Sequence, residues 1–295
     1  MRRGGRRQIQ YYLMPLGELA QTLIPRWLAL RIAWLMVWLA FPFLKTQRRV
    51  IAENFRHILG RELKPGEGDA LARRVMRNYA TCMADLLRSP QMCRLRNLDR
   101  LVPFQDNFEE LDRRLAGGKP LILVTAHCGN WDMAGVLMAY LGYPIVAVFE
   151  RITTGLSEAF NRFRGTSGMG LIGLDDHLGM ARAIDAGKMF VLVGDRDLKG
   201  NGQELPWFSG RRTFPRGAAA FSLRYNVPIV IGYLVLEPGD SRRRYRAVVE
   251  PPIEYQPIGD HDADIVALTA KVVQRLERVV AKHAEQWFVF QPKWQ

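Results

Sequence analysis

Residues 121–140 read LILVTAHCGNWDMAGVLMAY, and they contain the most informative pattern in the chain. The first five residues are apolar or favour strands, which is typical of a short buried strand that ends at a turn. The apolar segment that resumes at Trp131 is typical of a helix. The stretch therefore predicts a strand, a turn around His127 and a helix. In open α/β folds, ligands bind at such strand ends.

His127 and Asp132 lie five positions apart, one on the turn and the other in the first helical turn. We expect the carboxylate of Asp132 to reach back to the imidazole. A neutral histidine can remove a proton from a hydroxyl group while a carboxylate fixes its tautomer and stabilises the imidazolium. The alternative is a structural histidine followed by a carboxylate that complements the helix dipole. The spacing alone leaves both interpretations open.

Composition limits the partners of the chain. It has 295 residues, 48% of them hydrophobic, and a formal net charge of +13 with a pI of about 10.0. This charge predicts an anionic partner, such as nucleic acid, an anionic membrane, or a phosphorylated or thioester-carrier substrate. We expect no nucleic acid, because the arginines are spread along an α/β pattern and are not interleaved with aromatic residues on a platform.

The three cysteines, Cys82, Cys93 and Cys128, lack the spacing of a metal site or a disulfide framework, which fits a reducing compartment. Cys128 is either a nucleophile or a small turn residue. We favour the turn residue, because sequence neighbours at a turn usually point apart. The histidines other than His127 are scattered without ligand spacing, so we expect neither a metal nor a cofactor.

The N-terminal segment combines basic and apolar residues. Its first seven residues include Arg2, Arg3, Arg6 and Arg7. The uninterrupted apolar run 32–44 has 13 residues, fewer than the ~20 needed to span a bilayer. We therefore expect residues 1–48 to form a monotopic membrane-associating helical segment on an anionic lipid surface. A buried helix of the soluble core and a signal peptide are the alternatives, and the signal peptide lacks a cleavage site of small residues.

Residues 49–295 predict one α/β domain. Apolar β-rich runs recur along it, at 121–125, 144–149, 170–174, 189–194, 228–236 and 245–250. Helical patterns lie between or after them, at 132–141, 157–163, 178–186, 217–225 and 263–283. This alternation predicts a largely parallel or mixed central sheet flanked by helices. The phosphate-binding P-loop, the Rossmann glycine pattern and the G-x-S-x-G elbow are all absent from the sequence.

Charged residues cluster after two of these elements and in one loop. Arg164 follows the helical pattern 157–163, and Asp195, Arg196 and Asp197 follow a predicted strand. Glu204 lies in the glycine-bearing loop KGNGQELPWFSG. Buried charges need partners, so Asp195 and Arg196 either pair with each other or form an anion site beside His127 at the carboxyl edge of the sheet.

Several motifs resemble those of a known family. They are VIAENFRHILG (50–60), AHCGNWD (126–132), FRGTSGMG (163–170), GDRDLKGNG (194–202), WFSGRRTFPRGAAAFSLRYNVPIV (207–230) and EQWFVFQPKW (285–294). In this order they resemble the bacterial lipid A biosynthesis acyltransferase family, within the lysophospholipid acyltransferase superfamily. The resemblance spans nearly the whole chain.

The resemblance implies a peripheral or monotopic enzyme on the cytoplasmic face of the plasma (inner) membrane. It would transfer a fatty acyl group from acyl-CoA or acyl-carrier protein to a hydroxyl of a glycolipid, such as a lipid A precursor. The sequences of the HCGNWD and GDRDL motifs also resemble those of the phosphatidylinositol mannoside branch of the family. A thioesterase or lipid hydrolase that uses the same His–Asp pair is the alternative from another class.

The resemblance also implies roles for single residues. His127 and Asp132 correspond to the catalytic pair, and Arg164 to a substrate-binding arginine. The family also has an acidic residue in a conserved block that follows the histidine motif. It corresponds here either to Glu204 or to the charged group 195–197. We expect direct transfer without a covalent acyl-enzyme. The oxyanion of the transition state would be stabilised by Arg164, by Arg196 or by backbone N–H groups near Gly129.

Overall fold

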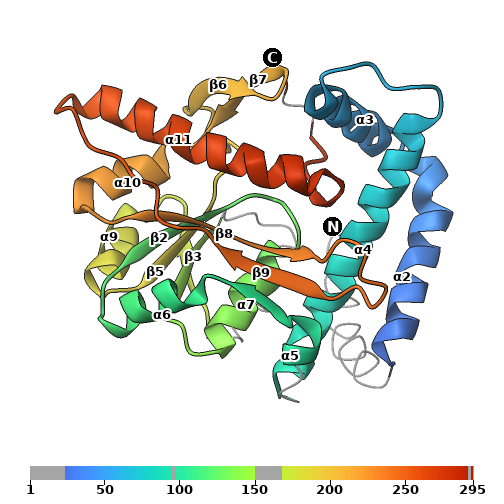
Figure 1. Cartoon of the computed structure of the whole chain (residues 1–295), viewed down its shortest axis with the longest axis horizontal. Helices are drawn as coiled ribbons and strands as arrows, with labels where there is room; N and C mark the ends of the chain where they lie inside the picture. Colours follow the sequence, from blue (N-terminus) through green and yellow to red (C-terminus); the bar gives the residue numbers. More distant parts are fainter. Residues whose placement is uncertain (1–23, 95–97, 150–167, 292–293, 295) are drawn as a thin grey trace, which may run out of the picture.

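A computed structural model describes residues 24–94, 98–149, 168–291 and 294 of the chain. The central sheet has seven strands in the order β1-β9-β8-β2-β5-β3-β4 (Figure 1). These strands are β1 (Phe104–Asp106), β2 (Leu121–Thr125), β3 (Ile145–Phe149), β4 (Gly170–Gly173), β5 (Met189–Val193), β8 (Ile229–Leu236) and β9 (Tyr245–Val249). All neighbours are parallel except β8 and β9, which confirms the predicted mostly parallel sheet.

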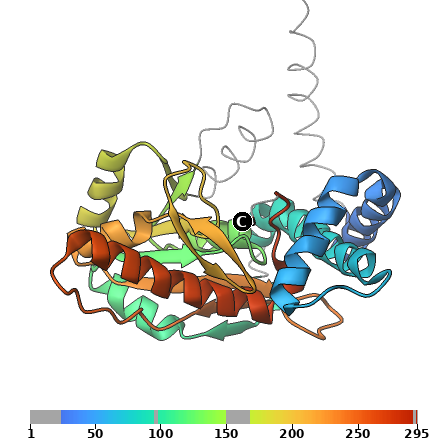
Figure 2. The same cartoon turned by 90° about the horizontal axis from the view of Figure 1, so that it is seen from above.

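Helices cover both faces of this sheet (Figures 1 and 2). One face packs against α6 (Phe108–Ala116) and α7 (Trp131–Tyr140), and the other against α9 (His177–Asp185), α10 (Gly217–Tyr225) and α11 (His261–Lys282). Successive side chains of β2 point to opposite faces of the sheet. Leu121 packs on the face covered by α6 and α7, whereas Ile122 and Val124 pack on the face covered by α9, α10 and α11. The strands and helices predicted for this region are present, except that 157–163 lies outside the described residues.

Two features of the fold differ from the sequence-based expectation. The stretch predicted as a glycine-bearing loop forms an antiparallel hairpin of β6 (Gln203–Trp207) and β7 (Gly210–Phe214). The edge strand β1 has only three residues and was not predicted. Neither strand contains an apolar run, because Glu204 and Pro206 interrupt β6 and the adjacent Arg211 and Arg212 interrupt β7.

The N-terminal helices stand together at one end of the molecule, on the right in Figures 1 and 2. They are α2 (Arg26–Ala40), the 3-10 turn η1 (Phe41–Phe43), α3 (Lys45–Leu59) and α4 (Glu67–Arg94), and the short α5 (Leu98–Leu101) follows. The α2 helix begins before the 13-residue run. Arg26–Phe43 is long and apolar enough to cross a membrane by length and composition, with mean hydropathy 1.3 and 11% of the segment buried. The basic residues 2–7 lie outside the described residues.

Candidate active site

The turn around His127 is fixed by backbone contacts with two distant segments. Gly129 has φ +67°, and a Cβ added there would lie 2.1 Å from the carbonyl oxygen of Leu234, so only glycine fits. The N–H of Gly129 donates to the carbonyl of Gln286 (2.8 Å), and the carbonyl of His127 accepts from the N–H of Phe288 (2.7 Å). The N–H of Asn130 donates to Leu234 in the same way (2.7 Å). His127 is therefore held on a rigid backbone.

The carboxylate that contacts the His127 ring is that of Asp195. The β2 and β5 strands are parallel with Thr125 opposite Val193, so the residues that follow them meet at one edge of the sheet. The Nδ1 atom of His127 lies 2.7 Å from Oδ1 of Asp195, and the backbone N–H of His127 donates to Oδ2 (3.0 Å). The ring also lies edge-on to Trp131, with 5.0 Å between ring centroids.

The ionisation of Asp195 decides which tautomer a neutral His127 adopts. Complete burial opposes the ionisation of Asp195, but the charge of His127 and the hydrogen bonds to the carboxylate outweigh it and lower its pKa to about 2. An ionised carboxylate accepts only, so the Nδ1 atom of a neutral His127 is the protonated nitrogen. Its Nε2 atom is then an acceptor, and it has no hydrogen-bond partner among the described residues. This is the arrangement that a general base needs.

Two residues near Asp195 were missed by the sequence analysis. Trp287, from the C-terminal segment, donates its indole N–H to Oδ2 of Asp195 (2.8 Å). Arg212, in β7, is only 2% exposed, and its guanidinium lies 5.1 Å from the ring centroids of both Trp287 and Trp294. Burial lowers the pKa of Arg212 to about 10, although the charge of Asp195 acts in the opposite direction. Nothing local in the sequence marks either side chain, because both contacts are long-range.

Asp132 lies in the first turn of α7 and is half-buried. Burial, and after it the charge of Asp132, raises the pKa of Tyr79 on α4. The role of Asp132 as the partner of His127 stays a prediction, while Asp195 is the carboxylate found on Nδ1. Arg164 lies outside the described residues.

The remaining predicted site residues have separate contacts. Arg196 donates to the side chain of Gln291 (2.6 Å), and its Nε is buried without a hydrogen-bond partner. The described residues show no contact between Arg196 and Asp195, whose carboxylate bonds to His127 and Trp287. Asp197 accepts three backbone N–H groups of the loop that follows it. Glu204 pairs with Arg211 across the β6–β7 hairpin, and no contact joins it to His127 within the described parts of the chain.

The surroundings of Cys128 and of the described histidines do not suit nucleophilic or metal chemistry. Cys128 is fully buried, and burial raises the pKa of its thiol well above the usual range, which agrees with a turn residue and not with a nucleophile. Among residues 24–94, 98–149, 168–291 and 294, no group of three or more histidine, cysteine, aspartate or glutamate residues is placed to hold a metal ion.

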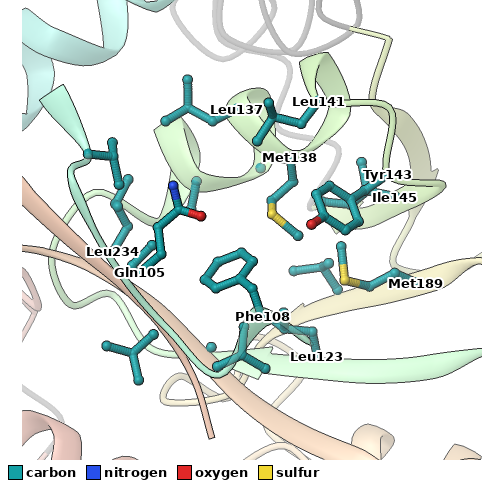
Figure 3. Close-up of a pocket in the computed structure, with 18 of the residues that line it drawn as sticks. Gln105, Phe108, Leu123, Leu137, Met138, Leu141, Tyr143, Ile145, Met189 and Leu234 are labelled. Atoms are coloured by element: carbon teal, nitrogen blue, oxygen red, sulfur yellow. The ribbon is translucent and has the colours of Figure 1, made fainter. Parts of the chain in front are cut away.

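An apolar cavity of about 610 Å³ lies between the sheet and α5, α6 and α7 (Figure 3). Figure 3 shows Phe108 and Leu123 pointing into it, with Met138 of α7 opposite. Thr125 and Trp131 also line it, and Trp131 contacts the ring of His127, so one end of the cavity borders the site. Its volume is within the usual range for a small-molecule site, roughly 300–1,000 Å³, and its lining suits a hydrocarbon chain.

Comparison with known families decides the identity of this fold. The sequence profile described as "Bacterial lipid A biosynthesis acyltransferase" matches residues 6–295. The chain belongs to this family. The protein is therefore an acyltransferase, and the resemblance noted from its motifs is confirmed.

Curated relatives of this acyltransferase carry a related name. "Phosphatidylinositol mannoside acyltransferase" from Mycobacterium tuberculosis (strain CDC 1551 / Oshkosh) is 24% identical over 228 residues, which are 74% of this chain and 68% of the relative. The protein of that name from Mycolicibacterium smegmatis is 23% identical over 232 residues, or 77% and 73% of the two chains. A third, from Mycobacterium tuberculosis strain H37Rv, is 24% identical over 68% of this chain and 61% of its own length.

Proposed function

We propose that this acyltransferase moves a fatty acyl group from an acyl thioester to a hydroxyl of a glycolipid, with His127 as the general base. The observation that carries the proposal is the His127–Asp195 hydrogen bond of 2.7 Å, made at the end of the apolar cavity. The donor is acyl-CoA or acyl-carrier protein, since both present an acyl chain on a thiol. The names of the relatives favour a phosphatidylinositol mannoside over a lipid A precursor as the acceptor.

The chemical steps follow from the orientation of the ring. The acceptor hydroxyl gives its proton to Nε2 of His127 as its oxygen attacks the thioester carbonyl carbon. Asp195 stabilises the imidazolium that forms, through Nδ1. When the tetrahedral intermediate collapses, the C–S bond breaks and the leaving thiolate takes the proton from Nε2. The acyl group is then an ester on the acceptor, and His127 is neutral again.

The oxyanion of the intermediate needs hydrogen-bond donors. The N–H groups of Gly129 and Asn130 already donate to backbone carbonyls, so the expected backbone donors near Gly129 are engaged. We propose Arg196 instead, because it follows Asp195 directly and its buried Nε lacks a partner among the described residues. Arg164 remains the other proposed donor.

The function is tested by giving the purified enzyme a labelled acyl-CoA and, separately, phosphatidylinositol mannoside or a lipid A precursor. We expect labelled mannoside lipid as the main product, with a higher kcat/KM than for the lipid A precursor. Labelled free fatty acid that forms at the same rate without any acceptor would identify a hydrolase and contradict the proposal.

The cavity predicts a dependence on acyl chain length. Met138→Trp fills part of the space opposite the sheet, so kcat/KM for long acyl donors is expected to fall at least about tenfold, with less effect on short ones. Leu178→Trp is the matched control, because Leu178 is 71% exposed on α9 and does not line the cavity. Equal losses for long and short donors would count against the cavity as the acyl site.

We propose that α2 lies in the membrane interface and does not cross the bilayer. Its outer face exposes large apolar side chains, including Leu35 (55% exposed) and Trp38 (65%). Its other face is tied to α4, where the indole N–H of Trp34 donates to Thr81 (2.9 Å) and Arg26 pairs with Asp85. A helix attached along one side to a polar domain can insert only its free side.

This placement predicts the effect of charges on the free face. Leu35→Glu together with Trp38→Glu should weaken binding to neutral lipid vesicles at least about tenfold, because two large apolar side chains no longer insert. Leu178→Glu, on the exposed side of α9, is the control. Co-sedimentation with vesicles measures the loss, and unchanged binding of the double variant would place the contact elsewhere.

A further inference from the structure

A second hollow, here called the arginine pocket, is defined by Arg77 and Asn78 of α4, Arg243 of the β8–β9 turn and His283 at the end of α11, with Trp34 of α2 in its lining. Its volume is about 890 Å³. It shares no lining residue with the apolar cavity, and none of the residues that line it contacts His127 or Asp195 within the described chain. It therefore lies apart from the His127–Asp195 pair, although the carbonyl of Gln286 in its lining also accepts from the N–H of Gly129 in the His127 turn (2.8 Å).

The carboxylates in the lining of this pocket are all neutralised. Each pairs with an arginine: Glu67 with Arg61, Asp240 with Arg244, Glu237 with Arg246 and Glu285 with Arg74. Three cations of the lining, Arg77, Arg243 and Lys282, have no carboxylate partner among the residues that the structure describes. The arginine pocket thus has an excess of positive charge.

Arg77 and Arg243 concentrate that charge on one side of the pocket. Arg77 lies over the ring of Trp34, at 3.9 Å from its centroid, and Arg243 donates to the side-chain oxygen of Asn78. Burial, and after it the positive charge of Arg77, lowers the pKa of Arg243. Arg243 also has φ +56°, a backbone conformation that is uncommon for residues other than glycine and is typical of functional segments. Two arginines that repel each other in the lining of one pocket are stabilised by an anion that binds both.

Two buried nitrogen atoms that belong to lining residues of the pocket lack partners in the described structure. They are Nε of Arg243 and Nδ1 of His283, whose side chain belongs to a residue only 5% exposed. Burial lowers the pKa of His283 to about 4, so its ring is neutral at pH 7 and can donate one hydrogen bond. A ligand that bridges both arginines of the lining is an anion with several acceptor oxygens. Phosphate has this chemistry, and the guanidinium fork matches its geometry.

We propose that the arginine pocket binds a phosphate group between Arg77 and Arg243, and that this phosphate belongs to the headgroup of a membrane lipid. The lipid source is argued from α2. Trp27 and Trp38 of that helix are 61% and 65% exposed, while Trp34 is turned toward α4, where its indole N–H donates to Thr81 (2.9 Å). Tryptophan favours the level of the lipid headgroups, and Trp34 lines the pocket. The assignment to a lipid rests on the proposed membrane contact of α2.

The test compares two pairs of substitutions that remove the same charge. Arg77→Gln with Arg243→Gln removes the proposed ligands. Arg73→Gln with Arg242→Gln is the control: Arg73 is on the same helix and stacks on Phe41 (4.1 Å), and Arg242 precedes Arg243, but neither lines the pocket. Both pairs lose general attraction to vesicles that contain phosphatidylglycerol, about thirtyfold for two charges. We expect the first pair to lose a further tenfold or more, because a specific charged hydrogen-bond site is lost as well.

A second measurement identifies the source of the phosphate. Inorganic phosphate, compared with chloride at equal ionic strength, should raise the Tm of the wild type and of the control pair but not of the Arg77/Arg243 pair. Arg77→Lys with Arg243→Lys keeps the charge and should bind with intermediate affinity, which separates loss of the site from misfolding.

Equal vesicle losses for both pairs without a phosphate effect on Tm would overturn the proposal. A Tm effect with equal vesicle losses would overturn the lipid assignment and identify a soluble phosphate compound. Acyl transfer by the wild type is measured separately in detergent. Absence of transfer there would contradict the acyltransferase proposal and would leave the phosphate proposal unaffected.

Discussion

Replacing His127 by glutamine is expected to lower kcat/KM for acyl transfer by at least the ~10²–10⁴-fold typical of a missing general base. Glutamine can still donate a hydrogen bond to Asp195, so the buried carboxylate keeps its partners and the fold should be retained. Single-turnover transfer from a labelled acyl thioester measures the loss, and circular dichroism checks the fold. A His127→Gln enzyme with near-normal transfer would remove His127 from the chemistry.

The same assay separates the two candidate carboxylates. Asp195→Asn should cause a loss approaching that of His127→Gln, because asparagine neither balances the imidazolium nor selects the tautomer with a proton on Nδ1. Asp132→Asn is the matched substitution five residues from His127. A severe loss for Asp132→Asn with a mild one for Asp195→Asn would assign the orienting role to Asp132. Cys128→Ser should transfer normally, and an acyl group trapped on Cys128 would contradict direct transfer.

The largest loss of stability is expected from Asp85→Ala. The carboxylate of Asp85 is fully buried on α4 and accepts from Nε and Nη2 of Arg26 (2.7 and 2.8 Å) and from the hydroxyl of Tyr245 (2.9 Å). Its removal leaves a largely buried guanidinium and a buried hydroxyl without their acceptor, at a cost of about 3–5 kcal/mol. Urea unfolding measures this change in the free energy of unfolding.

A surface pair gives the matched control for that prediction. Arg48 and Asp69 also join an N-terminal helix to α4, at 2.6 Å, but the side chain of Asp69 is 47% exposed. Asp69→Ala should therefore cost no more than about 1 kcal/mol. Similar costs for the two substitutions would show that burial does not decide the strength of the Arg26–Asp85 pair. The Asp85 variant should also affect transfer, because Tyr245 accepts a hydrogen bond from Asn130 in the His127 turn (3.4 Å).

The sequence by itself determined the elements around the site and their order. The change from a β-favouring apolar run to a turn and then a helix is a local pattern, so it placed His127 between β2 and α7. The strand 189–194 predicted that Asp195 follows a strand end in the same way. Parallel strands with helices between them then required both strand ends to lie at one edge of the sheet.

Only the tertiary structure decided which side chains meet there. The register of β2 with β5 brings Asp195 onto a histidine 68 residues away, and the return of the C-terminal segment brings Trp287 onto the same carboxylate from 92 residues away. Arg212 of the hairpin meets the ring of Trp287, and Arg26 pairs with Asp85 across 59 residues, so these contacts are also distant in sequence. Strand register and packing across such separations depend on the sum of many weak contacts. A local pattern therefore predicts that a charged residue needs a partner, but not which partner it finds.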